Sequence, residues 1–468
     1  MNESDHEELR RELVSLLGEF KVLWNKSDLL PYTKDTYRIR FEDDHRYFPD
    51  FAVLPETTQE VQGIVGIAAR RKIPLIPKGG GSNRTGMLVP IHGGILVDTI
   101  KMKRVVEVDK PNLCVTVQPG ITLKELADCL EDYGLWLTQE QGSLKIATVG
   151  GAISTSGFSR FHQKYGVIAD RVMSLEVVLA DGSVLRTGPK VLYTSTGYRL
   201  HQLFIAAEGT LGIITEATLR VEPLPEARDV VLAFYDDFWG ANDAAQRLMA
   251  SGVVFSGAEA YEGHGMDKLG APEDKTSLIY VIFHGTRGEV EAESAFVKKI
   301  VEGTHGVLAK HDVAMTFLDT YTEQWCGARA LTGFEDVITT YVPMERMKEF
   351  YDKLWNEIAP KYGLEPLPGE KYGLDVGRYR MVGGRYWLPK GERAWERYQE
   401  AVREISVLAT SFGGSIQSCH GVGIQHRENI TLEYSDVALD TMRNIKKVLD
   451  PDNIMNPGKK IPSKKRVP

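Results

Sequence analysis

The chain has 468 residues, of which 43% are hydrophobic and 26% are charged, and its formal net charge at pH 7 is −8. At roughly 100–200 residues per domain this length predicts two to four domains, and the composition argues against extended disorder. The acidic balance disfavours nucleic acid as a partner, because proteins that contact many phosphates usually carry a surplus of Lys and Arg.

The cysteines and the two ends of the chain add further exclusions. Cys114, Cys129, Cys326 and Cys419 lie far apart and form no CxxC pair, which disfavours a structural zinc site and a disulfide scaffold. The N-terminal stretch is charged throughout, unlike a signal peptide, and no run approaches the roughly 20 apolar residues of a membrane span. We therefore expect no integral membrane segment, a cytoplasmic location and a solvated basic tail over residues 461–468.

The first half of the chain alternates short helices and strands. Leu9, Leu13, Leu16 and Phe20 recur at helical spacing and predict a helix over residues 6–24. Short β-branched runs bounded by turn residues then predict strands, and two amphipathic stretches predict helices. The strands are expected at residues 52–54, 73–76, 94–98, 105–108, 114–117, 172–180, 184–186 and 213–221, and the helices at 60–71 and 123–133.

The composition changes after residues 223–225, where glycine becomes rarer and aromatic residues become more frequent. Helices are expected there at residues 242–250, 290–302 and 343–362, in a second α+β domain. Residues 400–447 predict two helices around a glycine-rich turn. The expected fold class is α+β.

Three glycine clusters are the most informative motifs. Residues 77–86 directly follow an expected strand, and their consecutive glycines allow positive φ, close approach of a ligand and an anion-binding nest of N–H groups. They match neither GxxxxGK(S/T) nor GxGxxG. Residues 148–157 add hydroxyls and glycines, and residues 208–214 form a glycine-hinged entry to a strand. Taken singly, each cluster fits a structural turn as well as a ligand site.

In this order and spacing, the three clusters resemble the flavoprotein family of vanillyl-alcohol oxidase and p-cresol methylhydroxylase. The resemblance runs from about residue 45 to residue 222. It resumes in the turn at 413–423 and in the closing residues 449–459, which look like the subgroup of D-lactate and glycolate dehydrogenases and alkyl-dihydroxyacetonephosphate synthases. Supporting phrases stand at residues 54–61, 117–120, 165–172 and 180–182.

The resemblance implies FAD, held by a two-part FAD-binding domain with an α+β cap for the substrate. Many relatives tether the flavin through a histidine beside the first glycine loop, and because Gly81 and Ser82 stand there we expect non-covalent FAD. The domains expected are 1–44 (N-terminal helical segment), 45–225 (FAD-binding domain), 226–400 (cap), 401–460 (a C-terminal segment that returns to the FAD domain and carries the HGVG turn) and 461–468 (basic tail).

The residues expected to contact FAD follow from the same family pattern. The first loop would wrap the pyrophosphate, residues 142–148 and 155–158 would run along the pyrophosphate and the isoalloxazine, and residues 208–214 would meet the adenosine side. They are Pro77, Lys78, Gly79, Gly80, Gly81, Ser82, Asn83, Gly142, Ser143, Leu144, Thr148, Gly150, Gly151, Thr155, Ser156, Gly157, Phe158, Glu208, Gly209, Thr210, Leu211, Gly212, Ile213 and Ile214.

A flavin dehydrogenase needs a base for the hydroxyl proton of its substrate and cations for a substrate carboxylate, which arginine binds through two parallel hydrogen bonds. His420 matches the family's active-site turn, and an Arg/Tyr cluster lies at residues 378–386. The alternatives are a structural histidine, and a solvated strand face or core tyrosine. The expected catalytic residues are His420, Tyr379 and Arg378, and the expected substrate-binding residues are Arg380, Arg385 and Tyr386.

Metal-dependent 2-hydroxy acid dehydrogenases of this group carry a His-x-Gly-Asp-x-x-x-His strand in the cap, and this chain has no such phrase. In the corresponding region, residues 375–386, arginines replace the histidines, so we expect no metal.

The resemblance implies an FAD-linked dehydrogenase or oxidase that oxidises a hydroxylated substrate, a D-2-hydroxy acid, by hydride transfer to FAD. Two alternatives stay open: an enzyme like alkyl-dihydroxyacetonephosphate synthase, and a flavin electron-transfer subunit. The electron acceptor (a quinone, an electron-transfer protein or oxygen) and a homo-oligomeric state are also left open.

Overall fold

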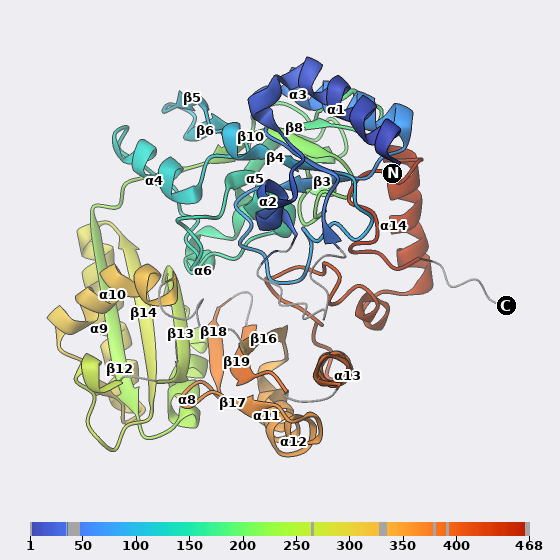
Figure 1. The fold of residues 1–468 in the computed structure, drawn as a ribbon. Helices are drawn as coiled ribbons and strands as arrows, with labels where there is room; N and C mark the ends of the chain where they lie inside the picture. The colour runs from blue at the N-terminus through green and yellow to red at the C-terminus, as the bar shows by residue number, and fades with distance from the viewer. Residues whose placement is uncertain are drawn as a thin grey trace.

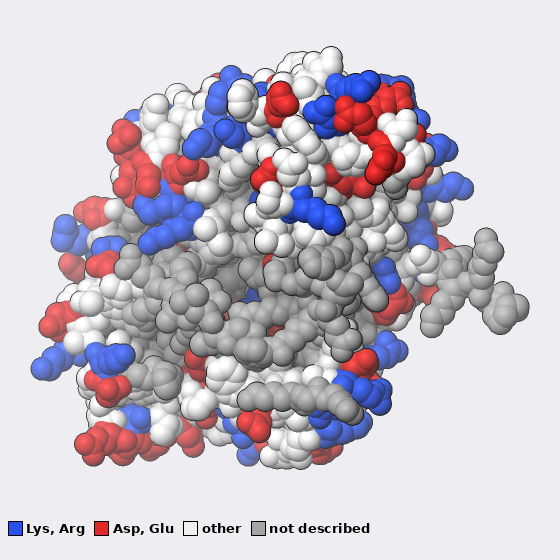
Figure 2. Space-filling view, viewed as in Figure 1, with Lys and Arg blue, Asp and Glu red and all other residues white. Residues whose placement is uncertain are grey.

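A computed structural model describes residues 2–33, 35, 47–263, 266–326, 335–377, 381–389 and 393–463. In Figure 1 the N-terminal half occupies the upper part of the molecule and the yellow-to-orange part lies below it, while the C-terminal helix α14 (Asp436–Leu449) returns to the N-terminal half. Over the described residues of this face, basic and acidic side chains are intermixed (Figure 2).

A small sheet covered by two helices opens the fold. The side chain of Thr57 caps the second of these helices, which begins at Thr58, by accepting the N–H of Glu60. The strand order is β1 (Val22–Leu23), β2 (Phe51–Val53), β4 (Ile95–Asp98) and β3 (Leu75–Lys78), of which β2, β4 and β3 run parallel, and the helices are α1 (Glu3–Leu17) and α3 (Thr58–Arg71). The helix predicted over 6–24 is shorter than expected, because Gly18 takes a φ of 83° and ends it. A short helix α2 (Lys26–Leu29) follows β1.

A five-stranded antiparallel sheet completes the N-terminal half. Its helix α4 begins with a capping box, in which Thr122 and Glu125 each accept the other's backbone N–H. The strand order is β5 (Val105–Asp109), β6 (Cys114–Val117), β10 (Ile213–Arg220), β8 (Val172–Val178) and β9 (Val184–Arg186). The helices beside it are α4 (Leu123–Glu131), α5 (Val149–Thr155), α6 (His162–Tyr165) and α7 (Ile168–Arg171), and β7 (Leu135–Trp136) pairs with β11 (Glu222–Pro223).

A larger sheet, here called the cap sheet, forms the second body. Its strand order is β15 (Val307–Leu308), β12 (Ala227–Tyr235), β14 (Ser277–Gly285), β13 (Gly257–Glu262), β18 (Gly373–Val376), β19 (Met381–Trp387) and β16 (Glu335–Tyr341), with β17 (Glu365–Pro366) paired to β19. Its helices are α8 (Phe238–Ala250), α9 (Arg287–Gly303), α10 (His311–Cys326), α11 (Met347–Lys353), a π-helical turn (Leu354–Ile358), α12 (Ala359–Tyr362) and α13 (Ala394–Ser411).

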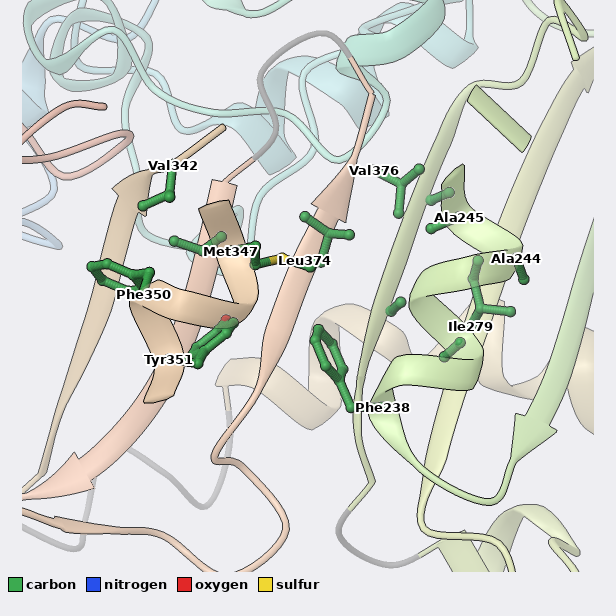
Figure 3. Packing of buried hydrophobic residues seen from close by; sticks show 14 of the residues in the cluster. Phe238, Ala244, Ala245, Ile279, Val342, Met347, Phe350, Tyr351, Leu374 and Val376 are labelled. Atoms are coloured by element: carbon green, nitrogen blue, oxygen red, sulfur yellow. The ribbon is translucent and has the colours of Figure 1, made fainter. Parts of the chain in front are cut away.

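The two faces of the cap sheet are covered by helices to different extents. On one face, alternate strand residues pack against α8, α9, α11 and α13, and Figure 3 shows Leu374 of β18 beside Met347 of α11, and Val376 of β18 beside Ala245 of α8. On the other face, α10 covers β12 and β14, and Phe317 of α10 packs there in a separate apolar cluster with Phe234 and Tyr280. The rest of that face, formed by β13, β18, β19 and β16, contributes side chains to the wall of a cleft.

The C-terminal segment is bound to the N-terminal half by polar contacts. The Lys446 ammonium of α14 donates to the carbonyl oxygens of Thr210 and Met455, each at 2.7 Å. The Asn456 amide donates to the carbonyl oxygen of Glu208, also at 2.7 Å. None of the helices in the described part of the chain is long and apolar enough to cross a membrane.

Candidate active site

A cleft of about 1170 Å³ lies between the glycine clusters of the N-terminal half and the uncovered part of the cap sheet. Strand alternation decides which cap side chains reach it, because residues two apart share one face. Those with side chains on this face are Glu259 and Tyr261 of β13, Asp375 of β18, Met381 and Arg385 of β19, and Val337 and Thr339 of β16.

The opposite wall is built from backbone. A Cβ added to Gly80 would lie 1.6 Å from the carbonyl oxygen of Ile146, and one added to Gly79 would lie 2.2 Å from Oγ1 of Thr148. The first glycine cluster therefore packs directly against Thr148 and against the backbone just before it, and a side chain at Gly79 or Gly80 is excluded by contact. The positive φ expected in this loop occurs at Gly81, with a φ of 74°.

The first glycine loop also presents unused N–H groups. Within the described part of the chain, the backbone N–H groups of Gly79, Gly80, Gly81 and Ser82 make no hydrogen bond. Successive free N–H groups form an anion-binding concavity that suits a pyrophosphate. The preceding Lys78 is already bound, since its ammonium lies 2.9 Å from Oδ2 of Asp98. A dinucleotide with a pyrophosphate and a long planar ring, such as FAD, fits this combination of nest and elongated cleft.

The structure brings most of the predicted FAD-contacting residues together. All of them line the described wall of the cleft except Leu144, Ser156, Thr210 and Leu211. Thr210 and Leu211 are buried beneath the wall, and Ser156 ends α5 in the left-handed region. These exceptions neighbour the lining residues in sequence, so a contiguous stretch predicted from the motif contains positions that face inward.

Glu208 binds the turn that carries the catalytic candidate. Its carboxylate accepts the backbone N–H groups of Val422 at 2.8 Å and Gly423 at 2.9 Å. The ammonium of Lys460 lies 3.3 Å from the same carboxylate. Glu208 lines the cleft, and these contacts fix residues 420–423 against the N-terminal half.

His420 lines the cleft between the two walls. Asn83 of the first glycine loop donates its side-chain amide to the carbonyl oxygen of His420 at 3.0 Å. Burial, helped by the charge of Arg84, lowers the pKa of His420 to about 3. The imidazole is therefore neutral at ordinary pH.

The hydrogen bonds around His420 assign its tautomer. Nδ1 lies 3.1 Å from Oγ1 of Thr339, and the Thr339 hydroxyl donates to the side-chain oxygen of Gln417. That oxygen also accepts the backbone N–H of Ser418 at 3.0 Å, so it is the acceptor. Because the Thr339 proton is already used, its oxygen accepts Nδ1–H of His420. Nε2 then carries the lone pair, as a general base requires.

The predicted Arg/Tyr cluster is only partly described. Arg378, Tyr379 and Arg380 lie outside the described residues. Arg385 lines the cleft, and its Nε lies 3.0 Å from Oε2 of Glu370. Tyr386 is 2% exposed in the apolar core on the opposite face, because adjacent residues of β19 point to opposite sides of the sheet. The structure therefore does not bring Tyr386 together with His420.

Two features of the cleft were missed by sequence reasoning. Arg84, near the end of the first glycine cluster, lines it, with Nη2 3.1 Å from Oδ1 of Asp336. His162 Nε2 lies 2.8 Å from Oδ2 of Asp375, and both side chains are almost fully buried. Burial, and the charge of Glu259 opposite it in the sheet, raise the pKa of Asp375 well above its usual range. No motif marks either pair, because each joins residues far apart in the chain.

Among the residues that the structure describes, no group of three or more His, Cys, Asp or Glu side chains is placed to hold a metal ion. His162 and Asp375 form a pair that joins the N-terminal half to the cap sheet.

Two protein families match the chain. Residues 49–188 match the family described as FAD binding domain, and residues 224–460 match the family described as FAD linked oxidases, C-terminal domain. The first match includes the first two glycine clusters, and the second includes the cap sheet and His420.

Named relatives match over nearly the whole chain. The glycolate oxidase subunit GlcD of Bacillus subtilis (strain 168) is 27% identical over 470 residues, covering 97% of this chain and 96% of that protein. The D-lactate dehydrogenase of Archaeoglobus fulgidus is 30% identical over 417 residues, covering 87% of this chain and 90% of that protein.

Solved structures share the fold at lower identity. The structure of p-cresol methylhydroxylase with substrate bound matches with a TM-score of 0.80 at 19% identity, covering 98% of both chains. An alkyldihydroxyacetonephosphate synthase matches with a TM-score of 0.78 at 21% identity, covering 96% of this chain and 84% of that chain. At these identities the likeness concerns the fold alone.

Proposed function

The chain belongs to the FAD-linked oxidases, and from that premise we propose that it oxidises a D-2-hydroxy acid by hydride transfer to non-covalently bound FAD. The matches confirm the family, the α+β fold class, the enzyme class and the FAD cofactor predicted from the sequence. They make the protein an FAD-linked oxidoreductase of the D-lactate and glycolate dehydrogenase type. The choice of substrate and the residue roles are the proposal.

The observation that carries the proposal is the placement of His420. Its Nδ1–H is bound to Thr339, and it lines the same cleft as the glycine loops. FAD, which supplies the hydride acceptor when bound, would be held by the loops at residues 77–83, 142–158 and 208–214. His420 Nε2 would take the proton of the substrate hydroxyl. One proton and one hydride leave the substrate, and a 2-oxo acid remains.

Non-covalent attachment is supported by the residues at the first glycine loop. Gly81 and Ser82 stand where many relatives carry a histidine, and neither offers an imidazole for a bond to the flavin. Acid precipitation of the purified protein should release the yellow colour into the supernatant. Colour that stays with the pellet would show a covalent bond.

Anaerobic mixing with single enantiomers of 2-hydroxy acids tests the activity. A D-2-hydroxy acid should bleach the flavin absorption, while its L-enantiomer should not, and readmission of oxygen should tell an oxidase from a dehydrogenase. A wild type that dithionite bleaches but no hydroxy acid reduces would contradict the proposal. Release of an acyl chain from an acyl ketose phosphate without net flavin reduction would instead support a synthase, and reduction only by a partner protein would support an electron-transfer subunit.

A further inference from the structure

Arg84 occupies a fixed position beside His420. The residues on either side of it are bound to the turn that carries His420: Asn83 donates to the carbonyl oxygen of His420 at 3.0 Å, and the carbonyl oxygen of Thr85 accepts the N–H of Ile424 at 2.9 Å. The backbone of Arg84 is therefore tied to the catalytic turn on both sides. Its side chain lines the cleft together with His420.

The guanidinium is held by one nitrogen and keeps its other donors. Nη2 lies 3.1 Å from Oδ1 of Asp336, whose other oxygen accepts hydrogen bonds from the hydroxyl of Tyr398 and the amide of Gln425. Asp336 is thus immobilised on the cap sheet. Arginine has five N–H donors in a planar fork. In the described part of the chain, the remaining donors of Arg84 have no protein partner, and 30% of its side-chain surface is accessible.

Among the residues that the structure describes, the other arginines and lysines of the cleft wall are less suited to bind a ligand. Lys78 and Arg385 have side-chain exposures of 18% and 11%, and each is paired with a carboxylate. Arg160 is 4% exposed and lies 3.3 Å from Glu140. Lys145 and Lys268 are exposed lysines, which offer a point charge rather than a fork. Arg84 combines an accessible fork with contact to the cleft.

From this arrangement we propose that Arg84 forms an anion-binding subsite beside His420 that holds the carboxylate of the substrate. The inference rests on the proposed function and names the group that recognises the acid part of a hydroxy acid. A carboxylate on the unused edge of the guanidinium forms two charge-assisted hydrogen bonds. It would place the adjacent hydroxyl-bearing carbon toward Nε2 of His420. This subsite belongs to the N-terminal wall of the cleft, whereas Arg385 belongs to the cap sheet.

The test measures anion binding in the FAD-loaded enzyme without turnover. Oxalate, a planar dianion that cannot be oxidised by hydride loss, is titrated while the flavin absorption is followed in the wild type and in Arg84→Gln. The dissociation constant should rise about 10- to 100-fold, the size expected for losing hydrogen bonds between two charged groups. Arg84→Lys keeps the charge but not the planar fork of donors, and should lose less oxalate affinity than Arg84→Gln. Arg247→Gln, which alters an exposed arginine of α8 bound to Asp243, is the matched control and should bind oxalate as the wild type does.

The outcomes separate this inference from the proposed function. Oxalate affinity equal to the wild type in an FAD-replete Arg84→Gln would overturn the subsite, and loss of FAD from Arg84→Gln or Arg84→Lys would overturn it in favour of a contact with the cofactor's phosphates. A wild type that binds oxalate through Arg84 but is reduced by no hydroxy acid would leave the anion subsite standing and contradict the proposed function. If hydroxy acids reduce the wild type, the KM for the acid should rise in Arg84→Gln while the KM for its methyl ester should not.

Discussion

At the residue scale, the neutral state of His420 makes a direct prediction. His420→Ala should slow anaerobic flavin reduction by roughly 10²- to 10⁴-fold, the usual range for losing a general base, while FAD stays bound. Because the pKa of His420 is lowered to about 3, the base is unprotonated over the working range, and the reduction rate in the wild type should not fall between pH 8 and pH 5. Stopped-flow absorbance measures both effects.

Cys419 offers a neighbouring control. Burial raises the pKa of its thiol to about 11, so it remains protonated and is a poor nucleophile. In Cys419→Ala, the substrate should therefore reduce the flavin at nearly the wild-type rate. A full reduction rate in His420→Ala, or a large loss of rate in Cys419→Ala, would contradict the assignment of the base to His420 rather than Cys419.

Thr339 is a positioning residue, and its role is separable from simple packing. Thr339→Val removes the acceptor of Nδ1–H, so the imidazole is no longer held in the tautomer that leaves Nε2 unprotonated. We expect about a tenfold drop in the reduction rate, close to the loss of one hydrogen bond, with little change in KM. Thr339→Ser keeps the hydroxyl and should restore the rate. Equal rates in the valine and serine variants would show that the hydroxyl does not act on His420.

Two adjacent glycines should respond differently to alanine. At Gly80 the new Cβ would lie 1.6 Å from the carbonyl oxygen of Ile146, so Gly80→Ala should force the first two glycine loops apart, with loss of FAD and a lower Tm. At Gly81 the nearest atom would be a carbon of Lys78 at 3.5 Å, and only the φ of 74° resists substitution, at roughly 1–2 kcal/mol. Gly81→Ala should therefore keep most of its FAD. Flavin absorbance per protein and thermal unfolding test the contrast, which equal losses in the two variants would contradict.

At the scale of elements, sequence patterns predicted the helices and strands whose bounds depend on local interactions. The capped helix α3, the strands β4 and β6 and the hairpin of β8 and β9 lie within a few residues of their predicted bounds, because period and turn residues mark them. The strand predicted at 73–76 is instead Leu75–Lys78. Helix α5 was not predicted, since its sequence contains two glycines; Thr148 caps it, and its apolar residues are buried.

The central cap strand β14 was also missed, because it is buried on both faces and its continuous apolar run carries no alternation. At the site, too, local motifs could be predicted from the sequence and tertiary contacts could not. The glycine loops and His420 carry motifs, whereas the contacts of Thr339 with His420 and of Arg84 with Asp336 depend on tertiary packing between distant segments.

At the scale of the whole molecule, the site is assembled from three parts of the chain. The N-terminal half supplies the glycine loops and Arg84, the cap sheet supplies Thr339, and the C-terminal return supplies His420. Glu208 and the His162–Asp375 pair hold these parts together. Their mutual position, rather than any one segment, determines whether a substrate carbon can lie between the base and the flavin.

Buried histidines make the stability of this assembly dependent on pH. Burial lowers the pKa of His284 and of His420 to about 3 and that of His426 to about 4, from an ordinary value of 6.5. Below pH 6.5 the unfolded chain binds up to three protons that the folded chain does not, so stability falls as the pH decreases. The pKa of Asp375 is raised, so the folded chain binds a proton at this carboxyl that the unfolded chain has released. This offsets one of the protons bound by the histidines of the unfolded chain. The free energy of unfolding should therefore fall by roughly 2 to 3 kcal/mol per pH unit between pH 6 and pH 4.5.

Thermal unfolding with saturating FAD at several pH values measures this slope. His284→Phe keeps an aromatic ring against Trp136 and Phe161 but removes one titrating group, and should flatten the decline of Tm on acidification. Most of the window lies above the ordinary pKa of carboxylates, so acid loss of surface ion pairs contributes mainly at its lower end. The buried Lys459, with its pKa lowered to about 7, acts only above this window. A Tm that stays constant from pH 6.5 to pH 4.5 would mean that the buried histidines accept protons without unfolding, and that the halves separate enough to admit water.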